Sequence, residues 1–148
     1  MELYKSKNWD VIYEDWGQEF IGQCIVSNNK ECLSDLIKEK WIELGKIEKE
    51  LERVTKKLFN STMYNFACLM NNAYRDNAKP YVHFHFIPRY KGNVCLFNKT
   101  YKDDHFGYNF WKWENSKLNR QKDIFTKDDR ICIFNMMKEE FNKANIER

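Results

Sequence analysis

The sequence is poor in residues that interrupt regular structure, and it lacks the long apolar runs that enter membranes. Its 148 residues include two prolines and five glycines, and no stretch reads as a linker or an internal repeat. No apolar run approaches the ~18 residues of a membrane-spanning helix. The stretch ELYKSKNWD after Met1 also lacks the apolar segment of a secretory signal. We therefore expect a single cytoplasmic domain with no membrane partner.

Paired cysteine motifs are also missing. The five cysteines are odd in number, far apart in the sequence and never arranged as CxxC: Cys24, Cys32, Cys68, Cys95 and Cys132. This pattern argues against a disulfide framework and against a zinc ribbon. Reduced, buried thiols in a cytosolic protein are the simpler interpretation.

A strong charge of one sign is absent as well. The 25 basic and 22 acidic residues give a formal net charge of +3, and the basic residues are scattered along the chain. Such a mild balance does not favour a nucleic-acid partner, although it would suit a small anionic ligand. With 43% hydrophobic and 32% charged residues, the chain has the composition of a globular protein.

The first half of the chain predicts a hairpin followed by a long helix. Residues 9–15 and 20–26 each read as a strand, with Gly17 between them. From Ser34 onward, apolar residues recur every three or four positions, which is typical of an amphipathic helix with a charged outer face. The predicted apolar stripe consists of Ile37, Trp41, Leu44, Ile47, Leu51, Val54 and Leu58.

The second half predicts further strands and a final helix. Residues 63–70 form a continuous apolar run, so we expect a central strand there, followed by a loop over 71–80. Residues 82–87 predict a strand that ends at Pro88, because proline lacks the amide donor of a paired strand, and residues 93–98 predict another. Thr126 is the expected cap of a helix with Asp128 and Asp129 in its first turn. Its apolar stripe would be Ile131, Phe134, Met137 and Phe141.

This order of elements predicts the α+β class. Late strands joined by short connections favour an antiparallel sheet, with the helices packed on one face. The expected architecture has about five strands, one long helix and a C-terminal helix.

Two of the three histidines lie one residue apart in YVHFHFIPRY, residues 81–90. In a strand, alternate side chains share a face, so Tyr81, His83 and His85 would point one way. Val82, Phe84 and Phe86 would point the other way, into the core. The two imidazoles would then stand about 6–7 Å apart on a rigid element, as a functional site requires.

The residues alone leave three interpretations of this histidine pair. The first is a pair of satisfied histidines on a half-exposed strand. The second is a metal site, with a third ligand from His105, Asp104 or a cysteine. The third is catalysis, in which one imidazole attacks an electrophilic phosphorus and the other handles protons or phosphate oxygens.

VHFHFIPRY resembles the signature strand of the histidine triad (HIT) family, in which histidines alternate with apolar residues before Pro-Arg. GQCIV at 22–26 and CLSDL at 32–36 are similar to the family's early strand and helix start. FACLMNN at 66–72 is similar to the strand before the signature in its diadenosine polyphosphate hydrolase subgroup. The resemblance implies one HIT-like domain over 1–148, with a core of about 9–98 and a C-terminal extension over 99–148.

The resemblance also implies roles for individual residues. His83 would be the nucleophile that attacks the α-phosphorus of a purine nucleotide and forms a covalent nucleotidyl-histidine intermediate. His85 would contact the phosphate or bridging oxygen. Asn71 and Asn72, together with Tyr81 and Arg89, would bind the nucleotide or its phosphates, and Ile12, Ile25 and Tyr13 could form an apolar slot for the base. We expect no protein metal site and no obligatory cofactor, a divalent cation arriving only with a polyphosphate such as diadenosine tetraphosphate.

Two departures from the family pattern keep alternatives open. Tyr81 stands where the first histidine of the triad belongs, and the loop SNNKE at 27–31 lacks the family's histidine. The leading hypothesis is a nucleotide hydrolase or transferase. The alternatives are a nucleotide-binding module with weak or no turnover, and a metal-binding protein that uses His83 and His85. The resemblance further implies a homodimer.

Overall fold

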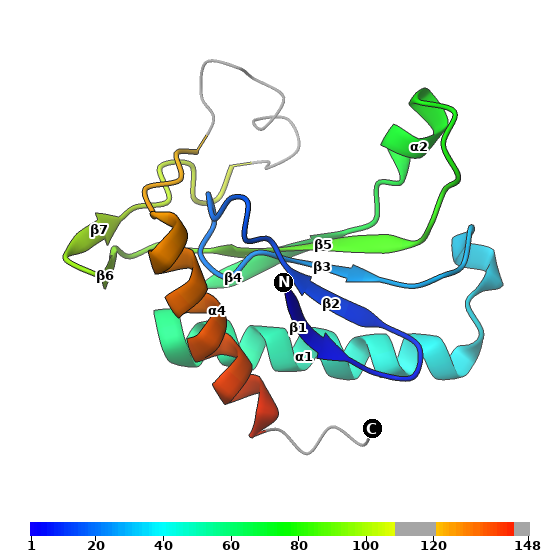
Figure 1. The fold of residues 1–148 in the computed structure, drawn as a ribbon, viewed down its shortest axis with the longest axis horizontal. Coiled ribbons are helices and arrows are strands. Elements are labelled where there is room, and N and C mark those ends of the chain that lie inside the picture. The colour runs from blue at the N-terminus through cyan, green and yellow to red at the C-terminus, as the bar shows by residue number, and fades with distance from the viewer. Residues whose placement is uncertain (109–120, 144–148) are drawn as a thin grey trace.

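The computed structural model describes residues 1–108 and 121–143. In these residues a five-stranded antiparallel sheet carries two long helices on one face (Figure 1). The sheet order is β1-β2-β3-β5-β4. Its strands are β1 (Glu2–Lys5), β2 (Asp10–Tyr13), β3 (Cys24–Ser27), β4 (Met63–Ala67) and β5 (His83–Arg89). The predicted α+β class and antiparallel sheet are confirmed.

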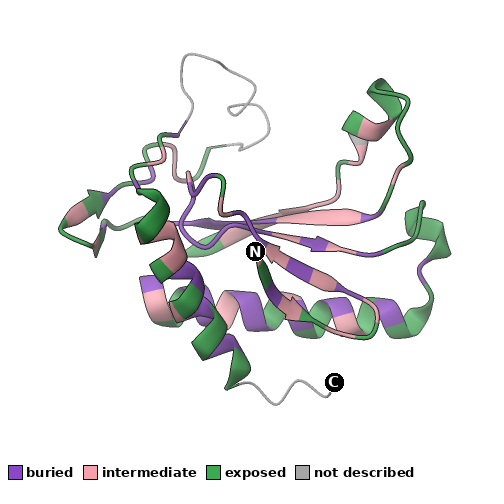
Figure 2. Ribbon diagram, in the orientation of Figure 1, coloured by how far each residue is buried: buried purple, intermediate pink, exposed green. Residues whose placement is uncertain are grey.

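The long helix α1 (Lys38–Phe59) follows a short 3-10 turn, η1 (Leu33–Asp35). Buried and exposed positions alternate along α1, as an amphipathic helix on a sheet requires (Figure 2). The buried positions include Leu44, Ile47, Leu51 and Val54 of the predicted stripe. Ile37 and Trp41 are exposed instead. Ile37 precedes the first residue of α1, and the Trp41 ring lies at 6.3 Å from that of Phe84 in β5. Asn60 ends the helix in a left-handed conformation.

The C-terminal helix α4 (Lys127–Asn142) begins as the sequence predicts. The Thr126 hydroxyl accepts a hydrogen bond from the Asp129 amide, which forms a capping box. Phe134, Met137 and Phe141 are buried as expected, whereas Ile131 is half-buried and Ile133 takes a fully buried place. The helix packs against α1 and β1.

Three strand predictions are corrected by the structure. Strand β1 was not predicted, because the stretch after Met1 is rich in charged residues. It nevertheless forms a short strand, in which Leu3 is buried. Strand β4 lies at the edge of the sheet rather than at its centre. Pro88 lies inside β5, opposite Tyr64. The partner strand β3 pairs only with His83–Phe86, so proline's missing amide interrupts no bond on that side.

The remaining elements are small. A short helix, α2 (Asn71–Arg75), occupies part of the predicted loop over 71–80. The predicted strand at 93–98 becomes a hairpin of β6 (Val94–Leu96) and β7 (Lys99–Tyr101), which forms a second sheet. None of the helices in the described ranges is both long and apolar enough to cross a membrane.

The hydrophobic core draws on both ends of the described chain. Leu3 from β1 and Ile133 and Phe141 from α4 are buried in the same cluster as Val26 and Phe86 of the sheet. Ile133 and Phe141, which follow residue 98 in the sequence, thus pack in the same hydrophobic cluster as the sheet.

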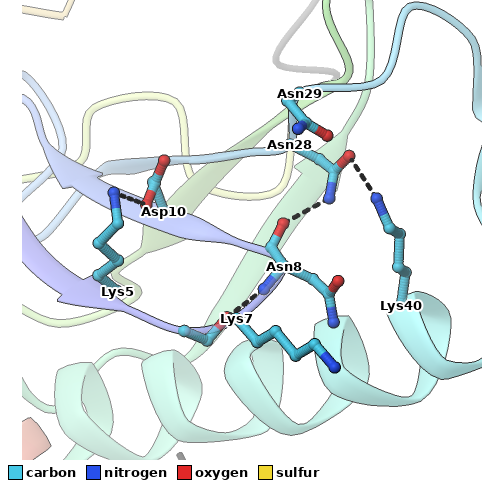
Figure 3. Close-up of a pocket in the computed structure, with 8 residues that line it drawn as sticks. Lys5, Lys7, Asn8, Asp10, Asn28, Asn29 and Lys40 are labelled. Atoms are coloured by element: carbon cyan, nitrogen blue, oxygen red, sulfur yellow. Dashed lines mark hydrogen bonds and ion pairs between the residues drawn. The ribbon is translucent and has the colours of Figure 1, made fainter.

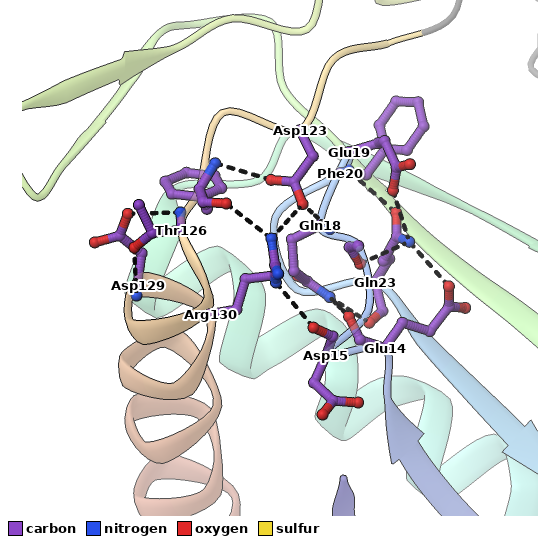
Figure 4. Close-up of polar contacts among 12 residues, drawn as sticks. Glu14, Asp15, Gln18, Glu19, Phe20, Gln23, Asp123, Thr126, Asp129 and Arg130 are labelled. Atoms are coloured by element: carbon purple, nitrogen blue, oxygen red, sulfur yellow. Dashed lines mark hydrogen bonds and ion pairs between the residues drawn. The ribbon is translucent and has the colours of Figure 1, made fainter.

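The loop between β2 and β3 is tied to the start of α4 by partly buried polar groups (Figure 4). The Arg130 guanidinium donates to the Asp15 carbonyl at 2.8 Å and pairs with Asp123 at 2.9 Å. Asp123 in turn accepts from the Gln18 amide at 3.0 Å. Within the loop, the buried Gln23 side chain donates to Glu14 at 2.9 Å. This network fixes the loop that borders one end of the sheet.

Candidate functional site

Strand β5 places both histidines on the sheet face opposite α1. His85 lies between Ile25 of β3 and Ala67 of β4, and His83 lies opposite Ser27 of β3. Val82 and Phe86, on the other face, are fully buried. The predicted alternation along this strand is therefore present, and both imidazoles are only half-buried.

The His83 ring is held by the backbone of a residue two positions earlier, Tyr81. Its Nδ1 lies 3.0 Å from the carbonyl oxygen of Tyr81. A carbonyl oxygen can only accept a hydrogen bond, so this contact requires the proton to be on Nδ1. The neutral ring then carries its lone pair on Nε2, away from the backbone. This is the tautomer that a nucleophilic histidine needs.

Three rings follow one another on this face. The centroids of Tyr81 and His83 are 4.7 Å apart, and those of His83 and His85 are 5.2 Å apart. The imidazoles are closer than strand spacing alone predicts, because their rings lean toward each other. Burial, and after it the neighbouring His83, lowers the pKa of His85 below its ordinary value of 6.5. The lowered pKa favours the neutral form of the His85 imidazole.

The floor beside the histidines is apolar. Ile12 of β2 lies opposite Ile25 of β3, which lies opposite His85, so the three residues form a row across the sheet. Both isoleucines are half-buried, so part of each apolar side chain is accessible on this face. Tyr13 does not belong to this slot, contrary to expectation. It is fully buried on the other face, where its ring packs 5.7 Å from that of Phe134.

A shallow hollow of about 250 Å³, here called the histidine pocket, lies beside His83. Its lining residues are Asn72, Ala73, Asp76, Ala78, Lys79, Tyr81 and His83. The structure thus brings together three of the predicted site residues. Asn72 belongs to the exposed first turn of α2, not to the end of a strand. Asn71 begins the same helix, and its side chain lies outside the described part of the chain.

Sequence reasoning missed two charged members of the histidine pocket. Lys79 pairs with Glu31 at 3.0 Å in an exposed contact, which leaves its ammonium available to a ligand. Asp76 is neutralised by Arg75 at 2.7 Å, and this hydrogen bond lowers the pKa of the Asp76 carboxyl. The only signal in the sequence was a lysine two residues before Tyr81.

Arg89 is not in the histidine pocket. Its side chain is 1% exposed and forms an ion pair with the buried Asp103, the closer contact being 2.7 Å from Nε. It also donates to Asn65 at 3.2 Å and to the His105 carbonyl at 2.6 Å, and its guanidinium lies 5.1 Å from the centre of the Phe20 ring. All these contacts are internal, so Arg89 braces the far end of β5 instead of facing a ligand.

The metal interpretation finds no ligand set in the described part of the chain. There, no three His, Cys, Asp or Glu residues lie together in a way that could hold a metal ion. The backbone of His105 contacts Arg89, near the end of β5 that is distant from His83. Asp104 pairs with Lys102 at the surface.

Comparison with known proteins identifies the fold. Neither a protein-family model nor a curated protein matches the chain. Solved structures do match, among them a hypothetical histidine triad nucleotide-binding protein from Sulfolobus tokodaii. The two chains share 14% identity over 96% of this chain and 83% of the other, with a TM-score of 0.65.

Two further matches are a Plasmodium falciparum diadenosine triphosphate hydrolase and a zinc-bound histidine triad family protein from Mycobacterium smegmatis. The first is 16% identical over 97% of this chain and 77% of the other, with a TM-score of 0.60. The second is 14% identical over 97% and 87%, with a TM-score of 0.57. At these identities the likeness shows the fold, which is the histidine triad fold that the sequence resemblance predicts.

Proposed function

We propose that this protein is a nucleotide hydrolase or transferase that attacks the α-phosphorus of a purine nucleotide with His83. The observation that carries the proposal is the contact between His83 Nδ1 and the Tyr81 carbonyl, which leaves the Nε2 lone pair free. The fold supports it, since one structural neighbour is a diadenosine triphosphate hydrolase. Dinucleoside polyphosphates and nucleoside phosphoramidates are the proposed substrate classes.

In the proposed reaction, Nε2 of His83 forms a bond to the α-phosphorus. The bond from phosphorus to the leaving group breaks, and its electron pair goes to the leaving oxygen or nitrogen. His85, neutral because its pKa is lowered, donates its N–H to that atom or to a phosphate oxygen as charge develops there. Water then attacks phosphorus, the bond from phosphorus to Nε2 breaks and its electron pair returns to Nε2. The water loses a proton to solvent, so the nucleoside monophosphate is released and His83 is restored.

The surroundings of the histidines suggest how the nucleotide lies. The apolar row of Ile12 and Ile25 would support the base beside His85. Asn72 and Lys79 would bind the phosphates from the other side of His83. A divalent cation would accompany a polyphosphate substrate as part of that substrate.

Hydrolysis of diadenosine polyphosphates by the purified protein tests the proposal. Replacing His83 with Ala removes the nucleophile, and we expect turnover to fall by a factor on the order of 10³ or more. His105→Ala is the control, because the Arg89 contact uses the His105 carbonyl, which alanine retains. Equal rates for His83→Ala and the wild type would disprove the nucleophile assignment.

A second candidate function is nucleotide binding with weak or no turnover. It is favoured by Tyr81, whose ring packs against His83 where the family has a histidine. This function predicts tight binding of AMP without a covalent adduct. Acid-quenched mass spectrometry after mixing with a dinucleoside polyphosphate separates the two functions, since a hydrolase would show a nucleotidyl adduct on the peptide that contains His83.

We also propose a homodimer, because β4 lies at the sheet edge and can offer its backbone groups to another strand. Sedimentation equilibrium at micromolar concentration should then give twice the mass of 18.1 kDa. A single species at the monomer mass would contradict this proposal.

A further inference from the structure

A second hollow, of about 260 Å³, lies where the β1–β2 turn, the end of β3 and the first turn of α1 meet (Figure 3). It shares no lining residue with the histidine pocket. Its walls are polar and include the side chains of Lys5, Lys7, Asn8, Asn28, Asn29 and Lys40. We call this hollow the lysine pocket.

Lys40 is the unusual member of the lysine pocket. Its side chain is 8% exposed, and its ammonium donates to the Asn28 side-chain oxygen at 3.1 Å. No carboxylate of the described residues pairs with it. An ammonium has three N–H groups, and burying its charge against a single neutral acceptor is unfavourable. The other N–H groups of Lys40 are therefore available to acceptors in the hollow that it lines.

Asn28 holds the Lys40 ammonium in place. Its side-chain oxygen also accepts from the Lys30 amide at 3.0 Å, and its side-chain nitrogen donates to the Asn8 carbonyl. Asn8 is fixed in turn by its contact with Glu43 of α1. The wall of the pocket is thus held by its own hydrogen bonds, as a binding site requires.

The charge of the pocket is positive. Lys5 is paired with Asp10 at 3.0 Å, whereas Lys7 has no ion-pair partner in the part of the chain that the structure describes. Three lysines against one aspartate leave an excess of two positive charges among the lining residues. Glu43 lies behind Asn8 and offsets part of this excess.

We propose that the lysine pocket binds a phosphate group. Lys40 would supply a buried, fixed charge, Lys7 a mobile charge at the rim, and the Asn8 and Asn29 side chains further polar contacts. A tetrahedral oxyanion provides the several acceptors that the Lys40 ammonium requires, and the hollow is much larger than the about 30 Å³ share of one water molecule. The ligand is inorganic phosphate, or the phosphate end of a small molecule.

The first experiment titrates inorganic phosphate into the His83→Ala protein, so that binding at the histidine site is weakened and the lysine pocket is observed. Calorimetry should detect saturable binding that weakens with added salt. Lys40→Met should reduce the affinity about tenfold, the effect of losing one charged hydrogen bond. Lys49→Met is the matched control, because Lys49 is an exposed lysine on the same helix, outside the pocket.

Titration of pyrophosphate and AMP in the same background distinguishes the sources of the phosphate group. If pyrophosphate or AMP binds more tightly than inorganic phosphate, and Lys40→Met removes this difference, the ligand is the phosphate end of a larger molecule. Undetectable phosphate binding, or equal affinities in Lys40→Met and Lys49→Met, would overturn the proposal. Neither result depends on turnover at His83, so this proposal and the proposed function fail separately.

Thermal unfolding provides a second readout that does not depend on binding heat. Lys40→Met keeps the aliphatic stem, and the Asn28 oxygen keeps its bond from the Lys30 amide. In phosphate-free buffer the variant should therefore unfold at the temperature of the wild type or above it. Added phosphate should raise the wild-type temperature more than that of the variant. Equal increases would count against the pocket, because they would reflect a general salt effect.

Discussion

The buried ion pair between Arg89 and Asp103 leads to a prediction that separates structure from ligand binding. The Asp103 carboxylate accepts from Arg89 at 2.7 and 3.0 Å, and from the backbone amides of Tyr90 and His105 at 3.2 and 3.3 Å. Asp103→Asn keeps the shape, removes the charge and turns an amide N–H₂ toward these donors. The Arg89 guanidinium then remains buried without its counter-charge.

The cost can be worked out from these contacts. Breaking a buried pair by removing one partner costs about 3–5 kcal/mol. Losing two charged hydrogen bonds, at about 1.5–3 kcal/mol each, gives a similar figure. A domain of this size has a total stability of about 5–15 kcal/mol. Urea unfolding should show this loss, and the melting temperature should fall by at least about 6 °C.

Asp104→Asn is the matched control, because the adjacent Asp104 pairs with Lys102 at the surface. It should cost between about 0 and 1 kcal/mol. Equal losses for the two variants would refute the assignment of Asp103 as the buried partner. If Arg89 were instead a phosphate ligand, Arg89→Met would weaken nucleotide binding more than it weakens folding, and Asp103→Asn would not reproduce its effect.

Three more predictions concern other parts of the fold. The folded state disfavours protonated His85, because burial lowers its pKa. The stability should therefore fall as the pH drops below about 6.5, and His85→Gln should reduce this slope when urea unfolding is compared at pH 7 and pH 5. Gly22 has φ +84°, and a Cβ there would lie 2.9 Å from the Thr55 methyl group. Gly22→Ala should cost about 1–3 kcal/mol in urea unfolding, whereas Gly45→Ala, on the open face of α1, should stabilise by up to about 1 kcal/mol. Arg130→Met should cost about 1–3 kcal/mol by loosening the loop contacts of Figure 4, and the exposed Lys127→Met should change the melting temperature little.

The fold was predictable where a local sequence pattern coincides with the residues that the core buries. The three- and four-residue spacing in α1 and the Thr126 cap of α4 both correspond to what the structure contains. The alternation in β5 was equally informative. These patterns depend on the spacing of apolar residues and on hydrogen bonds within a few residues. They can therefore be recognised without knowing the tertiary contacts.

The wrong predictions concern features that depend on which other segment of the chain packs against the residue. An apolar run such as that of β4 indicates that both faces are covered, but it does not say whether both edges are paired. Phe66 of β4 is partly covered by stacking on Phe84 at 4.9 Å, a contact between strands that spacing along one strand cannot reveal. Arg89 has the same explanation, since only the folded chain brings Asp103 to it.

For the candidate site too, the features set within one strand were predictable, and those set by other segments were not. Alternation placed His83 and His85 correctly, because a strand fixes the direction of its side chains. The histidine pocket beside His83 is formed by α2 and the loop that follows it, which bring Asn72 and Lys79 close to Tyr81. His85 does not line this pocket. Tyr81 is 49% exposed and packs its ring on His83 while its carbonyl orients the same imidazole. The backbone contact that sets the His83 tautomer is thus independent of the side chain at position 81, and replacing a histidine there leaves the proposed nucleophile oriented.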